Sequence, residues 1–213
     1  MEHVAHEAAE CEEIAVNALL TVGNSATERP KVVPGEPGIW VVIFGDLLVF
    51  SVLFACFVIE RSQAVDAFDA ARRTLHNGVG FANMLVLLSS SLLVVVGVHA
   101  LRSGRNSAAT RMVAGAMALG AVFVAVKVGE YVSAVSAGHT PAAGDFYTWY
   151  FLLTGMHLAH VLVGLIMLGC MTTLSRRPAP SETTVAVITA GACFWHLVDL
   201  LWIFLFPMLY LVG

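Results

Sequence analysis

Charged side chains are scarce in this chain. Asp, Glu, Lys and Arg together make up 12% of its 213 residues, whereas hydrophobic residues make up 58%. Soluble domains carry roughly 25% charged residues, so the chain has about half of the share that is usual for them. This shortage excludes an ordinary soluble domain, and the composition predicts an integral membrane protein.

Other features are missing as well. The four cysteines form no CxxC pair, so neither a disulfide framework nor a zinc knuckle is indicated. Lys and Arg form no basic patch, and nothing points to nucleic acid as a partner. Residues 1–37 contain no basic segment followed by an apolar core, which argues against a signal peptide. They are acidic and poor in apolar side chains, so we expect a mobile polar tail there.

Five stretches are long and apolar enough to cross a membrane as helices, since one crossing needs about 20 such residues. These stretches are Ile39–Ile59, Asn77–Leu101, Met112–Val132, Phe146–Cys170 and Val185–Val212. Short polar connections join them, so neighbouring helices should run antiparallel. The sequence therefore predicts an all-α fold, with one five-helix membrane bundle over residues 38–213. No internal repeat is visible, which argues against a transporter built from inverted repeats.

The distribution of Lys and Arg predicts the orientation of the bundle. The N-terminal tail, the second connection and the fourth connection lie on one side and carry seven of these residues. The opposite side carries three. Cytoplasmic loops are enriched in Lys and Arg, so we expect the N-terminus in the cytoplasm and the C-terminus outside.

Polar side chains lie inside all five apolar stretches. They are Asp46, Asn83, Lys127, Glu130, Thr154, His157, His160, His196 and Asp199. A charged Asp at the bilayer centre costs roughly 2.5–3.5 kcal/mol, so Asp199 needs partners on other helices. Counting about 1.5 Å per residue places His157 and His196 at similar depth in the outer half, with Glu130 within reach. The same count leaves Asp46 alone in the inner half.

The sequence thus predicts an outer cluster made of Glu130, His157, His160, His196 and Asp199. Three interpretations of this cluster stay open: a metal site, a haem held by facing histidines, and a network of hydrogen bonds that fixes the register of the helices. Di-iron bundles place a Glu three residues before each His, and this pattern is absent between His157 and His160. We favour the structural network, with Asn83, Lys127 and Thr154 as further partners.

Asp46 and Lys127 each invite a separate prediction. Asp46 is either a structural carboxylate bonded to Asn83 or a serine of the next helix, or a proton-exchanging group. A lone carboxylate in a membrane is a candidate functional site by default. Lys127 and Glu130 are one helical turn apart, so we expect an ion pair in which the Lys127 side chain extends outward to the membrane surface.

Three motifs carry a resemblance to a known family. They are Thr154–Gly164 (TGMHLAHVLVG), Phe194–Leu205 (FWHLVDLLWIFL) and the pair Glu130-Tyr131. Over about residues 38–213 the chain resembles subunit III of the haem-copper cytochrome c oxidases, in its short five-helix form. The resemblance implies a non-catalytic subunit of an aa3-type oxidase in aerobic respiratory electron transport, located in the bacterial plasma membrane.

The same resemblance implies partners and cofactors. The chain would pack beside subunit I, together with subunit II, and support the assembly, stability and proton uptake of subunit I. Haem and copper would lie in those partner subunits and not in this chain, while a phospholipid would bind between its helices. Asp46 matches the position of a buried glutamate of the family, which makes it the candidate proton-related residue.

Two alternatives remain beside this one. The Gly45-Asp46 pair resembles the branch of the family associated with nitric oxide reductases, so an accessory subunit of a nitric oxide reductase complex is the first. The second comes from another class of protein, a stand-alone membrane enzyme that binds metal or haem through the outer cluster.

Overall fold

The computed structural model describes residues 37–176 and 181–211. All of them belong to Pro34–Gly213, the second of two units into which the chain divides. The polar tail expected over residues 1–37 therefore lies, apart from Pro37, outside the described residues. Every regular element of the described part is a helix, and five helices are long and apolar enough to cross a membrane. The prediction of an all-α membrane bundle is confirmed.

The five long helices match the predicted stretches, and most of them extend further at one or both ends, whereas α7 ends before the predicted Val212. They are α2 (Pro37–Gln63), α4 (Asn77–Arg102), α5 (Asn106–Ser136), α6 (Asp145–Ser175) and α7 (Glu182–Phe206). Shorter elements are α3 (Val65–Arg72), η1 (Pro141–Ala143) and η2 (Pro207–Leu211). The extra turns carry polar side chains that can reach the interface between lipid and water, so the helices do not have to end where the apolar sequence ends.

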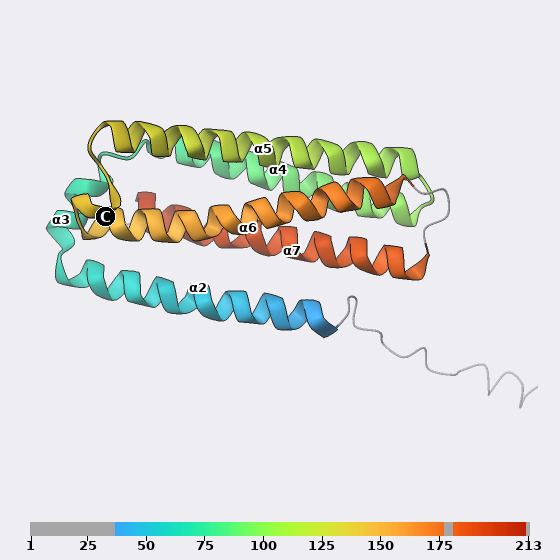
Figure 1. Ribbon diagram of the computed structural model, residues 1–213, viewed down its shortest axis with the longest axis horizontal. Helices are drawn as coiled ribbons and strands as arrows, with labels where there is room; N and C mark the ends of the chain where they lie inside the picture. Colours follow the sequence, from blue (N-terminus) through green and yellow to red (C-terminus); the bar gives the residue numbers. More distant parts are fainter. Residues whose placement is uncertain (1–36, 177–180, 212–213) are drawn as a thin grey trace, which may run out of the picture. The chain divides into compact units, whose positions relative to one another are not determined.

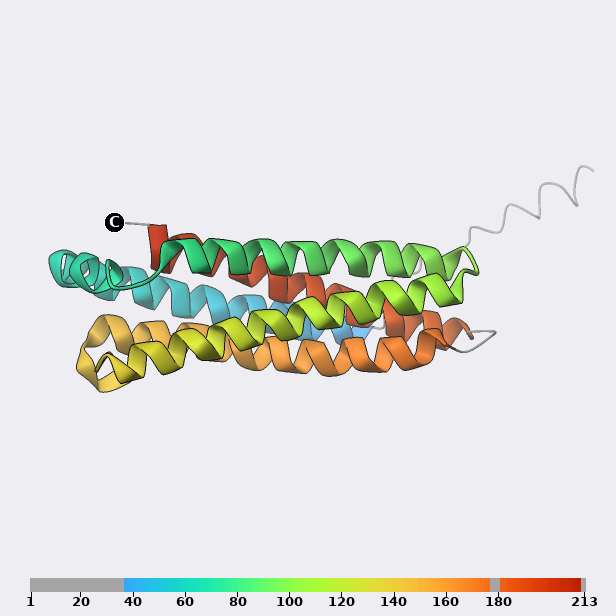
Figure 2. The same ribbon diagram turned by 90° about the horizontal axis from the view of Figure 1, so that it is seen from above.

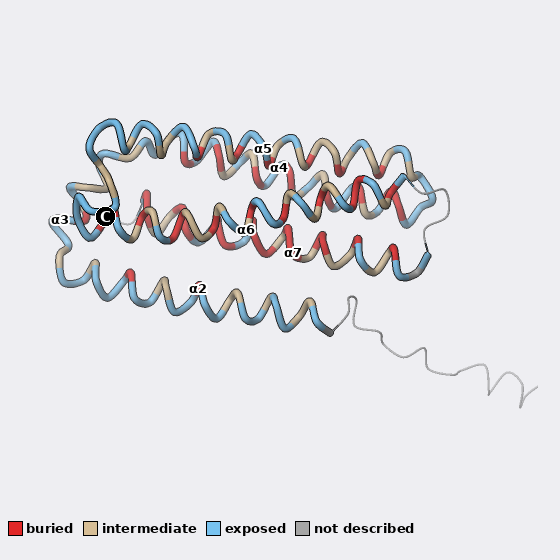
Figure 3. Tube along the Cα trace, viewed as in Figure 1, coloured by how far each residue is buried: buried red, intermediate tan, exposed pale blue. Residues whose placement is uncertain are grey.

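Helices α4 to α7 form an antiparallel bundle, and α2 lies against α6 and α7 (Figures 1 and 2). Buried positions concentrate on α7 and on the sides of its neighbours that face it (Figure 3). In the apolar core of α7, 61% of the residues are buried, against 11% in α2. Helix α7 is therefore the central element of the bundle, and α2 is a peripheral helix.

Trp195 explains how α7 packs so closely against α5 and α6. Its indole ring fills a slot next to Gly120 and Gly164, where a Cβ atom would come within 2.7 Å and 2.6 Å of the ring. The ring nitrogen donates a hydrogen bond to the Ser90 hydroxyl at 3.1 Å, and Ser90 donates to the Ala116 carbonyl at 2.9 Å. One side chain of α7 is thus fixed by three neighbouring helices.

The α-helical part of the last span ends at Phe206, and one π-helical turn, Pro207–Leu211, follows. Pro207 has no amide hydrogen for an α-helical bond, which accounts for the change at this residue. The turn buries Tyr210 completely. The Tyr210 carbonyl accepts a hydrogen bond from Arg72 of α3 at 3.0 Å, so the short helix fixes the end of the span.

Candidate functional site: polar groups inside the bundle

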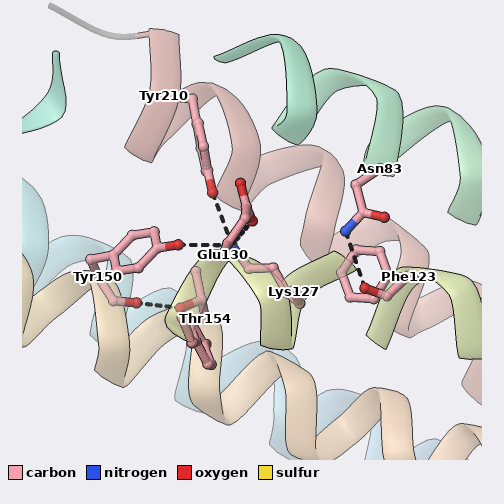
Figure 4. A network of polar contacts seen from close by, with 8 residues as sticks. Asn83, Phe123, Lys127, Glu130, Tyr150, Thr154 and Tyr210 are labelled. Atoms are coloured by element: carbon pink, nitrogen blue, oxygen red, sulfur yellow. Dashed lines mark hydrogen bonds and ion pairs between the residues drawn. The ribbon is translucent and has the colours of Figure 1, made fainter. Parts of the chain in front are cut away.

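Lys127 is the centre of the largest polar network. Its ammonium donates to Glu130 at 2.9 Å, to the Tyr150 hydroxyl at 3.0 Å and to the Tyr210 hydroxyl at 2.9 Å (Figure 4). The predicted ion pair with Glu130 is therefore present. The predicted direction of the side chain is wrong, because Lys127 is fully buried and points into the bundle. Three acceptors match the three hydrogens of the ammonium group.

Aromatic rings complete the surroundings of this cation. The Lys127 nitrogen lies 4.9 Å from the ring centre of Tyr150 and 5.1 Å from that of Trp202. The rings of Tyr131 and Tyr210 are at 5.6 Å and 5.4 Å. Such contacts stabilise a cation that has lost its water. The pattern of polar residues along the chain does not reveal the tyrosines. Tyr150 stands in a group of aromatic residues at the start of its apolar stretch, which is typical of the membrane interface, and Tyr210 stands alone in an apolar run.

Thr154 belongs to the same region. The Tyr131 hydroxyl donates to the Thr154 hydroxyl at 2.7 Å. Thr154 donates to the Tyr150 carbonyl at 2.5 Å (Figure 4). Asn83 is also buried, and its side-chain amide donates to the Phe123 carbonyl at 3.3 Å. Thr154 therefore ties α6 to α5, and Asn83 ties α4 to α5.

Asp46 has a partner that the sequence did not predict. Its carboxylate lies 3.5 Å from His160 Nε2, so the expectation that it is isolated from the histidines is wrong. The depth count aligned the ends of the helices, but α6 extends past the start of α2 (Figure 1). Both side chains are about three-quarters buried, with exposed fractions of 24% and 22%.

The hydrogen bonding of His160 restricts the state of this pair. Its Nδ1 lies 2.8 Å from the Met156 carbonyl, which can only accept, so Nδ1 carries the hydrogen. A neutral ring then has a bare Nε2 facing Asp46. The contact consequently needs one proton, which resides either on Nε2 or on the carboxyl group.

His196 and Asp199 face α4 instead of α6. His196 Nδ1 lies 2.5 Å from the Ser91 hydroxyl. Neither carboxylate oxygen of Asp199 has a hydrogen-bond partner, although the residue is only 4% exposed and Ser91 lies close enough to interact with it. The predicted contacts of Asp199 with His157 and His160 are therefore wrong, and Ser91 is the neighbour that the pattern missed.

His157 is packed between aromatic rings. Its ring stacks on Trp202 with centres 5.0 Å apart and meets the edge of Phe123 at 5.7 Å. Both ring nitrogens are buried and have no hydrogen-bond partner. The five residues predicted as one outer cluster thus belong to separate contacts, and in the described part of the chain no three His, Cys, Asp or Glu residues are placed to hold a metal.

Comparison with known proteins agrees with the three motifs. The chain matches the family model of cytochrome c oxidase subunit III over residues 35–213. It is 30% identical over 192 residues to cytochrome c oxidase subunit 3 of Corynebacterium diphtheriae, covering 88% of this chain and 92% of the relative. It is 28% identical over 177 residues to quinol oxidase subunit 3 of Bacillus subtilis, covering 83% and 86%. The chain therefore belongs to the cytochrome c oxidase subunit III family.

Proposed function

We propose that this chain is the non-catalytic subunit III of an aa3-type cytochrome c oxidase in aerobic respiratory electron transport. It packs beside subunit I, together with subunit II, and supports the assembly, stability and proton uptake of subunit I, with haem and copper in those partners. The observation that carries this proposal is the match to the family model over 35–213, which includes every helix of the bundle. The relative from Corynebacterium diphtheriae favours cytochrome c as the electron donor.

A quinol oxidase subunit is the second candidate, because relatives of similar coverage carry that name. Purification of the complex through a tag on this chain decides between them. We expect haem and copper subunits to accompany the chain, and O2 consumption to depend on reduced cytochrome c. Consumption driven only by quinol would favour the second candidate, and reduction of nitric oxide in place of O2 would favour the nitric oxide reductase alternative.

We propose an orientation with the N-terminus in the cytoplasm of a bacterial cell and the C-terminus outside its plasma membrane. Arg102, Arg105, Arg111 and Arg176 lie at the end of the bundle that holds the α4–α5 and α6–α7 connections. Arg61, Arg72 and Arg73 lie at the opposite end, near α3. The excess at the first end supports a cytoplasmic location for it.

We propose that Glu130, His157, His160, His196 and Asp199 hold the bundle together through separate contacts. Glu130 neutralises Lys127 within α5, His157 stacks on Trp202 of α7, and His160 meets Asp46 of α2. His196 and Asp199 lie near Ser91 of α4.

We also propose that a phospholipid binds this chain. A groove of about 430 Å³ between α2, α6 and α7 supports this, because its lining is apolar and one acyl chain fills a space of this kind. Gly38, Ala190 and Gly191 line this groove, and their small side chains leave space for the acyl chain.

Asp46 and His160 form the candidate proton-exchanging pair. Replacing Asp46 with Asn should make the oxidase lose activity faster during turnover, because proton uptake into subunit I becomes slower. Assembly should change little, since an ion pair whose side chains stay partly exposed contributes roughly 0–1 kcal/mol. The measurement is the decay of O2 consumption with the number of turnovers, and Ser51→Ala, an exposed position on the same helix, is the control. An unchanged rate of inactivation in Asp46→Asn would remove the proton role.

A further inference from the structure

The two carboxylate oxygens of Glu130 have different surroundings. Oε2 accepts the hydrogen bond from the Lys127 ammonium at 2.9 Å, whereas Oε1 has no hydrogen-bond partner among the described residues. The Glu130 side chain is 13% exposed, and that of Lys127 is 1% exposed. The burial of this ion pair is therefore uneven, because protein encloses the cation while the carboxylate keeps a surface that water can touch.

A pocket of about 140 Å³ adjoins Glu130. It lies where α5 ends, between the segment that joins α3 to α4 and the first turns of α6 (Figure 1). Among its lining residues, Thr74, His76 and Ser133 are exposed, so the pocket opens at the surface. One water molecule needs about 10–15 Å³ of such space and a few polar partners, so several can reach Glu130.

The titratable groups that face Glu130 come from several elements. Inside the bundle they are Lys127 and Tyr131 of α5, Tyr150 of α6 and Tyr210 of η2. In the pocket they are His76, His139 and Tyr147. Tyrosine hydroxyls are uncharged near neutral pH. Histidine gains positive charge as the pH falls, so the two histidines have to be controlled for in any response to acid.

A proton on Oε1 of Glu130 changes the state of Lys127. The protonated carboxyl group can still accept through Oε2, so the ammonium keeps its hydrogen bonds. It loses the only counter-charge that it has among the described residues, and a buried ion without its partner is strongly destabilising. Tyr210 holds the ammonium from η2, a single turn of five residues that is tied to Arg72 of α3. The loss therefore bears on η2.

We propose that Glu130 is a proton-binding site that opens to the aqueous phase through this pocket. As the pH falls, water in the pocket delivers a proton to Glu130 Oε1, Lys127 is left without its counter-charge, and η2 loosens from α3. The contribution of the pair to stability is present while Glu130 is charged and is lost on acidification. In the proposed orientation, this site responds to the acidity outside the cell, a role beyond assembly of the complex.

Infrared difference spectroscopy tests the binding of the proton. The tagged full-length chain, with the subunits that accompany it, is held in lipid nanodiscs and brought from neutral to acidic pH. We expect a band of a protonated carboxyl group that is lost in the double variant Lys127→Met, Glu130→Gln, which has no buried charge to destabilise it. Acid spectra of wild type and double variant that share every carboxyl band would overturn the proposal.

A cysteine in the pocket tests the route of the proton. In Ser133→Cys, reaction with a bulky water-soluble thiol reagent should slow the appearance of the Glu130 band after a pH jump. The wild-type chain treated with the same reagent is the control, because Cys56, Cys170 and Cys193 are present in both. Complete labelling of Ser133→Cys that leaves the rate unchanged would show that the pocket is not the route.

Hydrogen exchange tests the consequence for η2. From neutral to acidic pH, the amides of residues 208–211 in the wild type should gain roughly tenfold or more in exchange rate over those of the double variant, since about 1.4 kcal/mol lost by the closed state multiplies the open population by ten. The variant His76→Gln, His139→Gln should keep this response. Equal changes in wild type and Lys127→Met, Glu130→Gln, or a response that disappears with the histidines, would refute the proposal.

Discussion

Replacing Glu130 with Gln should destabilise the subunit by roughly 3–5 kcal/mol, the usual cost of leaving a buried charge without its partner. Lys127 is fully buried, and among the described residues the only carboxylate bonded to its ammonium comes from Glu130, at 2.9 Å. The tyrosine hydroxyls that remain bear no formal charge. The measurement is the free energy of unfolding of the purified subunit in detergent, together with the yield of assembled oxidase.

The double variant Lys127→Met, Glu130→Gln is the matched control for this prediction. Removing both charges leaves no buried ion, and well-packed apolar replacements of ion pairs are often neutral. We therefore expect it to recover most of the stability that Glu130→Gln loses. A single variant as stable as wild type would show that the ammonium is not held by this pair, and a double variant as unstable as the single would assign the loss to packing.

Replacing Gly164 with Ala should cost roughly 1–3 kcal/mol, because an extra methyl group in a filled core forces its neighbours to move. The new Cβ atom would come 2.6 Å from one atom of the Trp195 ring and 2.8 Å from another. The indole cannot retreat easily, because its nitrogen is bonded to Ser90 and Gly120 bounds the slot on another side. Thermal unfolding of the subunit and the yield of the complex measure the effect.

Gly155 offers a matched control on the same helix. A Cβ atom at Gly155 would have the Tyr131 hydroxyl, at 4.0 Å, as its nearest contact. Alanine there should leave stability unchanged or raise it slightly, since alanine favours the helix over glycine by about 1 kcal/mol. In a second control, Trp195→Phe should restore part of the loss in Gly164→Ala. Equal effects at Gly155 and Gly164 would argue against the steric explanation.

The number and the positions of the membrane helices could be predicted because length and apolarity are properties of each segment alone. The polar contacts depend on how the segments are rotated and displaced, and the sequence does not state either. Lys127 shows what the sequence leaves open about rotation. Its pair with Glu130 could be predicted because the two residues are one turn apart on the same helix. The two tyrosine hydroxyls could not, because they come from α6 and η2.

Asp46 and His157 show what the sequence leaves open about the displacement and rotation of whole helices. A count of residues from the ends of the helices assumes that all helices begin at the same level, and the displacement of α6 relative to α2 brings His160 to Asp46. His157 lies only three residues before His160, yet the rotation of α6 turns it toward Trp202 and Phe123. Residues that share a depth in the membrane thus have different neighbours.

The network around Lys127 also has a consequence for the order in which the protein is made. Glu130 lies on the same helix as Lys127, so α5 can enter the bilayer with its two charges already neutralised. The hydroxyl of Tyr150 arrives 23 residues later, and that of Tyr210 arrives 83 residues after Lys127. The ammonium group gains its last acceptor only when η2 has been synthesised and folded inward. The inward folding of η2 is therefore coupled to the hydrogen bonding of one buried cation.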